Sequence, residues 1–433
     1  MANAALKGGR RSGTTAAWGV FLLAFALRVV AGFLLNLRPW GLRGYGFYRE
    51  MAQNLLSGEG LHFRYYYGLG DAWANRPPLY PIFLAGLETV AGASPVVIIL
   101  GQSVLGAITA VLAFALGRRA GGPGAGLAAG LLVAIYPYFV VNDTTLVEQP
   151  LSACLLAAFA LAFLTGAGGA RGAAATGVLG GLLSLTREVF VPLFGLALLV
   201  RVLGAGGGRG RARLRWAALC ALAFAATVTP WLARNAARFG RPGFSFSDGK
   251  ALWVGNNPHT FSRYPRGSID ASEWEAFSRL PDEVKDRLRR APDEVAQQAE
   301  YRALALDFIR EDPTRFMHGG LRKVVALLSP VLTPRGDSWM KDWAYGLSYG
   351  PVLVLALFGV FLGRRWLPIG MVAGLTLLAL AGVSFIFWGQ TRIRAPADVL
   401  LIVLAGGVLA RLAARPRIAG GEGPVRGPSG PRR

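Results

Sequence analysis

The feature that most constrains this chain is a series of long apolar blocks that recur along its 433 residues. Four clear examples are Ala17–Leu27, Val96–Leu116, Leu151–Leu164 and Pro351–Leu362. A helix needs about 20 mostly apolar residues to cross the hydrocarbon of a bilayer, and only helices and closed barrels satisfy their backbone there. The blocks are rich in Leu, Ala and Gly and lack the alternation of barrel strands. The sequence therefore predicts an all-α polytopic membrane protein.

Composition agrees with this class and argues against a nucleic-acid partner. Hydrophobic residues make up 53% of the chain and charged residues 16%, whereas a soluble domain carries about 25% charged residues. The formal net charge is +22, but the basic residues stand between apolar blocks instead of lining one face. That distribution is typical of cytoplasmic anchors. Cys154 and Cys220 both lie inside apolar blocks, so no disulfide or thiolate metal site is predicted.

Basic connections fix the predicted orientation of the spans, because Lys and Arg concentrate in cytoplasmic loops. The connections placed on the cytoplasmic side are Arg118–Arg119, Arg171, the group Arg209, Arg211, Arg213 and Arg215, Arg364–Arg365, and the tail from Arg411. The ten spans that satisfy this placement are about 17–36, 97–117, 123–141, 148–166, 172–187, 189–203, 214–233, 348–363, 367–388 and 396–411.

Two further apolar segments are too short for a full span: Leu79–Ala91 and Val324–Leu332. We expect both to be interfacial or re-entrant helices, because counting either alone as a crossing puts basic connections outside. If both cross, the count becomes twelve.

The topology divides the chain into five parts. These are a cytoplasmic N-terminus (1–16), an N-terminal transmembrane module (17–233) that includes a first outer loop (37–78), a large extracytoplasmic loop (234–320), a C-terminal transmembrane module (321–412) and a disordered cytoplasmic tail (413–433). In the large loop an amphipathic helix is predicted by the spacing of Val295, Ala299, Ala303, Leu306 and Ile309.

Ionisable residues collect at the outer boundary of the predicted bundle. They are Tyr48, Glu50, Asp71 and Arg76 in the first loop, Asp143 and Glu148 at the start of span 148–166, Arg187 at the end of span 172–187, and Arg392 and Arg394 before the last span. Charges at membrane depth are costly and usually face a cavity or one another, so the set is a candidate site. Any single member is equally well explained as an interfacial anchor or a structural ion pair. Arg28, in the middle of the first span, is expected to make a polar contact between helices.

The residue types suit chemistry at a lipid phosphate. A guanidinium binds phosphate through two parallel hydrogen bonds, and a neighbouring carboxylate can accept a proton from an attacking hydroxyl. Departure of a lipid phosphate beside a general base is the minimum for sugar transfer from a polyprenyl-phosphate donor. The residues alone permit this reaction without selecting it over transport.

Several short motifs follow one another along nearly the whole chain. They are Tyr48-x-x-x-Ala52-x-Asn54–Leu55–Leu56-x-Gly58-x-Gly60, Arg76–Pro77–Pro78–Leu79–Tyr80–Pro81, Glu148, Leu185–Thr186–Arg187, Pro230–Trp231-x-x-Arg234–Asn235, Gly255–Asn256–Asn257–Pro258 and Arg392-x-Arg394-x-Pro396. No single motif is specific, but the ordered set resembles the dolichyl-phosphate-mannose protein mannosyltransferase and aminoarabinose lipid A transferase superfamily.

The resemblance implies the C-type glycosyltransferase fold, a bundle of about 10–12 transmembrane helices with outer interfacial helices. It also implies an active site on the extracytoplasmic face of the plasma membrane. Such enzymes take sugar from a polyprenyl-phosphate carrier, usually with inversion, and pass it to a protein, lipid or cell-wall glycan acceptor.

Site residues are carried over from the resemblance one by one. Glu148 matches the family's acidic position, with Glu50 and Asp143 as the other catalytic candidates. The donor phosphate is expected to be bound by Arg187, Arg392 and Arg394. Substrate is expected to be bound by Tyr48, Arg76, Asn256 and Asn257.

The first loop departs from the family's pattern. The family carries an Asp about four residues before the Tyr of this loop, whereas this chain has Gly44 there and no acid between Arg28 and Glu50. Either Glu50 or Asp71 replaces it from the same loop, Glu148 or Asp143 takes the role, or transferase activity is lost. Glu50 stands two residues beyond Tyr48, about 200° around a helix, which makes a simple exchange awkward.

Two other functions stay open beside the transferase. One is a catalytically inactive relative that binds a lipid-linked sugar or a partner; the other is a transporter or flippase. A transporter predicts inverted repeats, and we find none in this sequence. The histidines His62, His259 and His318 lack metal-ligand spacing, so no histidine metal site is predicted. The residues leave one cofactor open, a divalent cation held between a carboxylate and the donor phosphate.

Overall fold

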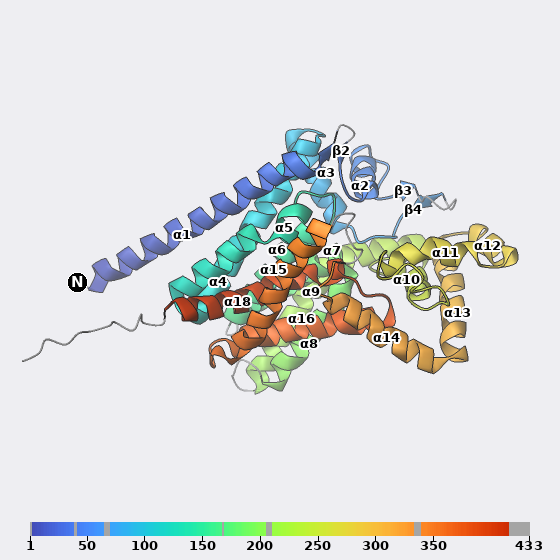
Figure 1. Ribbon diagram of the computed structural model, residues 1–433. Helices are drawn as coiled ribbons and strands as arrows, with labels where there is room; N and C mark the ends of the chain where they lie inside the picture. Colours follow the sequence, from blue (N-terminus) through green and yellow to red (C-terminus); the bar gives the residue numbers. More distant parts are fainter. Residues whose placement is uncertain are drawn as a thin grey trace, which may run out of the picture.

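A computed structural model describes residues 2–38, 41–64, 70–166, 169–204, 210–332 and 339–414, with side chains from residue 13 onward except that of Arg38. The predicted tail at 413–433 lies almost entirely outside these residues. The predicted N-terminal segment 1–16 contributes to the first helix, α1, which runs over Ala2–Ala31. Figure 1 shows a helical bundle that carries both large loops at the end farthest from the N-terminus.

Six helical segments in the described part of the chain are long and apolar enough to cross a membrane. They are formed by α1 with the π-helical turn Gly32–Asn36, α4 (Pro95–Ile135), α9 (Gly210–Phe239), α15 (Trp339–Gly359) with the turn Val360–Leu362, α16 (Leu367–Ile386), and α17 (Thr391–Arg394) with the turn Ala395–Ala397 and α18 (Asp398–Ala413). These segments contain seven of the ten predicted spans, because α4 contains two.

Helix α4 is a hairpin of two arms instead of one rod. At Gly122 the backbone leaves helical geometry, with φ 84° and ψ −171°, and Pro123 starts the second arm. A Cβ added at Gly126 would lie 2.8 Å from the carbonyl oxygen of Phe114, although twelve residues of straight helix span about 18 Å. The arms therefore pack side by side, and their turn follows directly on the basic pair Arg118–Arg119.

The other three predicted spans are shorter helices: α6 (Gln149–Thr165, 17 residues), α7 (Ala170–Thr186, 17 residues) and α8 (Val191–Leu203, 13 residues). Helix α5 (Pro137–Asn142) and the 3-10 turn Glu188–Phe190 connect them to their neighbours. Small residues allow close packing in this region. A Cβ at Gly177 of α7, for example, would lie 2.2 Å from the carbonyl of Cys220 in α9.

Both short apolar segments form helices that are not among the six long ones. Helix α3 covers Leu79–Ala91, as predicted. The other, α14, covers Pro313–Leu328, so the predicted boundaries of Val324–Leu332 were wrong. The helix begins eleven residues earlier because the Asp312 carboxylate caps it, accepting a hydrogen bond of 2.9 Å from the backbone N–H of Arg315.

The second loop, residues 234–320, is helical over much of its length. Its helices and turns before α14 are α10 (Asp248–Gly255), the 3-10 turn Ile269–Ser272, α11 (Glu273–Ser278), α12 (Asp282–Arg289) and α13 (Glu294–Glu311). The predicted amphipathic helix is present as α13, but the predicted apolar face was wrong. The buried face carries Gln297, Tyr301 and Ala305, and the Tyr301 ring packs 5.1 Å from that of Trp253 in α10.

The first loop, residues 37–78, contains α2 (Gly46–Leu56) and two small antiparallel strand pairs. The strands are β1 (Leu37–Arg38) with β2 (Gly41–Leu42), and β3 (Phe63–Arg64) with β4 (Asp71–Ala72). A backbone bridge joins Gly44 to Leu146, with the Tyr45 N–H donating to the Leu146 carbonyl at 2.8 Å. This bridge holds the start of α2 beside the start of α6, where the candidate site lies.

Candidate functional site

The site is built on Glu148 and Arg187, which lie at neighbouring ends of two antiparallel helices. Glu148 directly precedes α6, and Arg187 directly follows α7 in extended conformation. At the opposite ends of the same helices the backbones of Gly166 and Gly172 are in close contact. Arg187 Nε lies 3.3 Å from Glu148 Oε1, and both side chains are largely buried, at 12% and 7% exposed.

The second oxygen of Glu148 is an unsatisfied acceptor at this site. Glu148 Oε2 is buried and has no hydrogen-bond partner among the described residues. The phenol of Tyr48, from α2, lies within interaction range of this carboxylate. Burial first, and then the Glu148 charge, raise the pKa of Tyr48, so the phenol stays protonated and can only donate to an anion.

Arg392 extends the site toward the second loop. Arg187 donates a hydrogen bond of 3.3 Å to the Arg392 carbonyl, which joins the end of α7 to α17. The Arg392 guanidinium donates to Asp270 Oδ2 at 2.9 Å and to the Tyr45 hydroxyl. Burial raises the pKa of Tyr45 although Arg392 opposes the shift. Asp270 Oδ1 is a second buried oxygen without a partner in the described part of the chain.

Arg76 and Glu188 complete the group. Arg76 interacts electrostatically with Tyr48, Glu188 and Glu148 and stacks 5.4 Å above the ring of Phe47. Burial opposes its charge, but Tyr48 and Glu188 outweigh burial and raise the pKa of Arg76. Glu188 accepts a hydrogen bond of 2.9 Å from the Ser245 hydroxyl. We call the whole set the ion cluster: Tyr45, Tyr48, Arg76, Glu148, Arg187, Glu188, Asp270 and Arg392.

Arg394 lies away from the ion cluster, although it stands only two residues from Arg392. Its side chain is fully buried and pairs with Asp398 at 2.9 Å. Its other nitrogens donate to the Tyr345 hydroxyl at 2.5 Å and to the carbonyls of Leu327 and Ser329. All of its donors thus serve contacts inside the bundle.

The two other catalytic candidates are also held elsewhere. Asp143 pairs with Arg28 at 2.6 Å, and both side chains are buried. Arg28 also donates to the carbonyls of Ala24, Val133 and Ala134, which makes the expected polar contact between helices. Glu50 accepts a hydrogen bond of 2.7 Å from the backbone N–H of Arg64, so it fastens α2 to β3.

The two predicted substrate-binding asparagines, Asn256 and Asn257, make hydrogen bonds that hold the second loop in place. Asn256 donates to the carbonyls of Leu252 and Ile386, and it accepts from the buried ammonium of Lys323 at 3.0 Å. Asn257 donates to the carbonyls of Trp253 and Val254. Neither amide reaches the ion cluster through these contacts.

The backbone at Gly44 explains the absence of an acid there. Gly44 has φ +118°, a conformation that favours glycine. A Cβ at this position would lie 2.4 Å from the Leu146 carbonyl oxygen. The first loop therefore meets the segment before α6 through its main chain, at the position where the resemblance implies an aspartate.

Three members of the ion cluster were missing from the predicted site: Tyr45, Glu188 and Asp270. Glu188 directly follows Arg187, and Tyr45 stands three residues before Tyr48, so proximity in sequence could have suggested both. Asp270 lies 122 residues from its partner Arg392, and no local motif marks it.

Within the described ranges, no three His, Cys, Asp or Glu side chains come together as ligands for a metal ion. A divalent cation at this site would therefore need further ligands from its substrate.

Comparison with known proteins agrees with the resemblance read from the motifs. Residues 75–233 match the family described as dolichyl-phosphate-mannose-protein mannosyltransferase. This segment carries Arg76, Glu148 and Arg187. No curated protein matches the chain significantly.

Solved structures match the chain over most of its length. The archaeal oligosaccharyltransferase AglB from Archaeoglobus fulgidus, in complex with an inhibitory peptide and a dolichol-phosphate, gives a TM-score of 0.58 at 15% identity, covering 93% of this chain and 50% of that one. The apo form of the Archaeoglobus fulgidus oligosaccharyltransferase gives a TM-score of 0.54 at 16% identity, covering 92% of this chain and 50% of that one. ArnT from Cupriavidus metallidurans in the apo state gives a TM-score of 0.43 at 17% identity, covering 92% of this chain and 79% of that one.

The chain spans about half the length of the archaeal oligosaccharyltransferases it matches. At these identities the structural likeness concerns the fold, whereas the sequence match concerns one segment. Residues 75–233 therefore carry the sequence signature of the dolichyl-phosphate-mannose-protein mannosyltransferases, on a membrane chain that has the C-type glycosyltransferase fold.

Proposed function

We propose that this chain is a plasma-membrane glycosyltransferase that moves a sugar from a polyprenyl-phosphate donor to a hydroxyl of an extracytoplasmic acceptor. The observation that carries the proposal is the Glu148 carboxylate. One oxygen is held by Arg187 at 3.3 Å, and the other is buried without a partner among the described residues. A buried acceptor oxygen left unpaired is costly, and a donor hydroxyl would relieve that cost.

The reaction assigns one role to each end of the Arg187–Glu148 pair. The acceptor hydroxyl donates its proton to Glu148 Oε2 while its oxygen forms a bond to the anomeric carbon. The bond between that carbon and the donor phosphate breaks, and the phosphate keeps the electron pair. Tyr48, whose phenol is protonated, can donate to the same region.

The arginines stabilise the departing phosphate. Arg187 and Arg392 keep 12% and 23% of their side chains exposed, and guanidinium groups bind phosphate oxygens through paired hydrogen bonds. Arg76 adds a third positive charge to the ion cluster. All hydrogen-bond donors of Arg394 are engaged in contacts inside the bundle. We therefore assign phosphate binding to Arg76, Arg187 and Arg392.

The test uses Glu148→Gln and Arg187→Ala in the full chain, in vesicles supplied with radiolabelled polyprenyl-phosphate sugars. Glu148→Gln removes the general base and is expected to reduce transfer by about 10²–10⁴-fold. The same variant is expected still to bind the polyprenyl-phosphate sugar. Arg187→Ala is expected to weaken donor binding as well. Arg364→Ala, an exposed residue between α15 and α16, is the control. Full activity in both site variants would refute the assignment.

An inactive relative that only binds the lipid-linked sugar is the second candidate, and Gly44 is the observation that favours it. The same vesicles separate the two functions. A transferase releases free polyprenyl phosphate in step with sugar transfer, whereas a binding protein retains the donor intact in wild type and in Glu148→Gln alike.

A further inference from the structure

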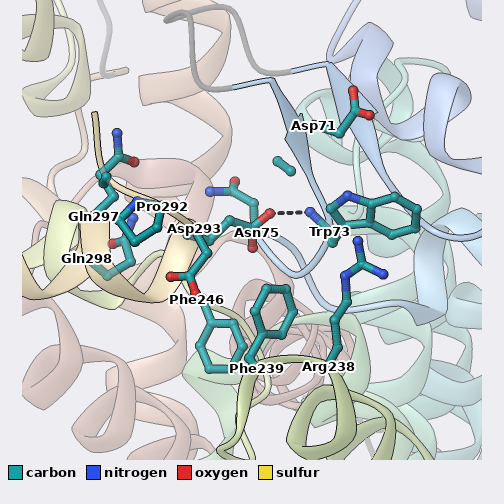
Figure 2. Close-up of a pocket in the computed structure, with 13 residues that line it drawn as sticks. Asp71, Trp73, Asn75, Arg238, Phe239, Phe246, Pro292, Asp293, Gln297 and Gln298 are labelled. Atoms are coloured by element: carbon teal, nitrogen blue, oxygen red, sulfur yellow. Dashed lines mark hydrogen bonds between the residues drawn. The ribbon is translucent and has the colours of Figure 1, made fainter. Parts of the chain in front are cut away.

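A separate cavity of about 470 Å³ lies between the first and second loops. Its walls come from β4 and the segment after it, the end of α9, residue Phe246, and residues 291–298 at the start of α13. Figure 2 shows Trp73, Asn75 and Arg238 on one side, with Asp293, Gln297 and Gln298 facing them. The volume falls within the range of small-molecule sites. We call it the interloop cavity.

Asn75 presents a polar side chain to this cavity. It is only 7% exposed and lines the cavity. No hydrogen bond joins its amide to any residue that the structure describes, so the amide is available to a molecule in the cavity. Its amide offers two donors and one acceptor oxygen, which suits a ligand rich in hydroxyl groups.

The charges of the cavity exclude an anionic ligand. Three carboxylates line it, from Asp71, Asp293 and Glu294, against the single guanidinium of Arg238. That guanidinium stacks 3.6 Å above the Trp73 ring, so it is already engaged. The Glu294 carboxylate accepts from the backbone N–H groups of Trp73 and Ala74. Like charges in such a site would repel a phosphate or a uronate.

The interloop cavity adjoins the ion cluster through two shared segments. Asn75 lines the cavity, and the next residue, Arg76, belongs to the ion cluster. In the same way Phe246 lines the cavity, whereas Ser245 donates to Glu188 of the ion cluster. The two segments are tied together by the Phe246 N–H, which donates to the Ala74 carbonyl at 2.6 Å.

From this arrangement we infer that the interloop cavity binds an uncharged or amine-bearing carbohydrate, as the subsite for the sugar portion of the acceptor. The inference rests on the proposed function for its role in transfer, but binding itself requires neither a donor nor Glu148. Asn75 hydrogen-bonds the hydroxyl groups, the carboxylates of Asp71 and Asp293 accept further hydroxyl or ammonium protons, and anionic sugars are rejected.

The experiment measures binding of three monosaccharides with the same ring, namely glucose, glucosamine and glucuronate, to the purified full chain by saturation-transfer NMR. Glucose and glucosamine are expected to bind, and glucuronate to bind at least tenfold more weakly. Asn75→Ala is expected to weaken glucose binding at least tenfold. Gln53→Ala removes an exposed amide of the first loop and is expected to bind as wild type does.

Three results would overturn the inference: no binding of any of the three sugars, equal binding in Asn75→Ala and wild type, or tightest binding of glucuronate. Melting temperatures of both variants check that the fold is retained. Glu148→Gln separates this inference from the proposed function. If Glu148→Gln still binds sugar and also transfers sugar as wild type does, the transferase mechanism is refuted. The inference about the interloop cavity then still stands.

Discussion

At the scale of single residues, Gly44 shows how a missing side chain can have a structural cause. Its φ of +118° and the nearby Leu146 carbonyl leave no room for a Cβ. The bridge that fills this space brings α2, with Tyr48, beside Glu148. The first loop thus contributes Tyr45, Tyr48, Arg76 and a main-chain contact to the ion cluster, and Glu148 directly precedes α6.

Restoring an aspartate at this position is therefore expected to harm the protein. Gly44→Asp forces a side chain into a left-handed conformation and against a carbonyl, which costs about 1–3 kcal/mol or more. We expect a lower melting temperature and less than a tenth of wild-type transfer. Gly46→Ala is the matched control, because a Cβ there meets nothing within 4 Å. Increased transfer in Gly44→Asp would show that the bridge is dispensable.

Glu294 is expected to make the stability of the protein depend on pH. Burial raises its pKa to about 6, although the backbone N–H groups of Trp73 and Ala74 oppose the shift. A carboxyl whose pKa is raised on folding binds more protons in the folded state between its unfolded pKa of 4.5 and about 6. Its contribution to stability is present below pH 4.5 and is lost as the pH rises through 6.

The expected result is a loss of about 1–2 kcal/mol of stability between pH 4.5 and 6.5 from this group. Glu294→Gln, which does not titrate, is expected to flatten that part of the profile of melting temperature against pH. The measurement is a thermal-unfolding series in detergent. A profile of Glu294→Gln that parallels wild type throughout this range would contradict the prediction.

Sequence reasoning reached the members of the ion cluster that stand in motifs. Arg76, Glu148, Arg187 and Arg392 could be grouped because the topology brings the ends of their helices to one side. Asp270 could not be reached, because its position depends on how the second loop folds back onto α17. The different contacts of Arg392 and Arg394 were equally hidden, since they depend on which way each side chain leaves one short turn of helix.

At the scale of elements, the Arg28–Asp143 pair connects α1 to the segment between α5 and α6. Arg28 lies in the membrane-spanning part of α1 and also donates to two carbonyls of the second arm of α4. A buried ion pair of this kind is costly to break on one side only, by about 3–5 kcal/mol, because the remaining charge is left alone.

We therefore expect Arg28→Met to lower the melting temperature strongly. The double variant Arg28→Met with Asp143→Leu is expected to recover much of that loss, because neither charge remains. Transfer per folded molecule should stay close to wild type in the double variant, since Asp143 lies outside the ion cluster. Thermal unfolding and transfer activity are measured together. A stable but inactive double variant would assign Asp143 a direct part in the chemistry.

Helices were predicted more reliably than their faces. Apolar blocks located the six long segments together with α6, α7 and α8, because burial in lipid requires long apolar runs. The face of α13 was missed, since Gln297 and Gln298 are buried by hydrogen bonds to the Leu288 carbonyl and the Lys250 N–H. Such contacts depend on the neighbours of a helix, which its own spacing does not reveal.

At the scale of the whole molecule, both loops lie at one end of the bundle (Figure 1), and the ion cluster includes Arg76 of the first loop and Asp270 of the second. The basic residues at the α4 turn and between α15 and α16 are the predicted cytoplasmic anchors. If the loop end faces outward, an exposed residue of the second loop and one between α15 and α16 must differ in accessibility from outside the cell.

Cysteine labelling tests this orientation. Asp282, whose side chain is 97% exposed, and the exposed Arg365 are each replaced by Cys. The native Cys154 and Cys220 are buried and give a low background. A membrane-impermeant maleimide is expected to label Asp282→Cys in intact cells and Arg365→Cys only after permeabilisation. The reverse pattern would place the ion cluster in the cytoplasm.

The tight reversal at Gly122 has a consequence for how the chain is made. A connection of one or two residues leaves almost no chain outside the bilayer between the two arms of α4. We therefore expect the arms of α4 to enter the bilayer together as a paired hairpin. In the predicted orientation Arg118 and Arg119, next to the bend, stay on the cytoplasmic side and set the direction of that paired insertion during synthesis.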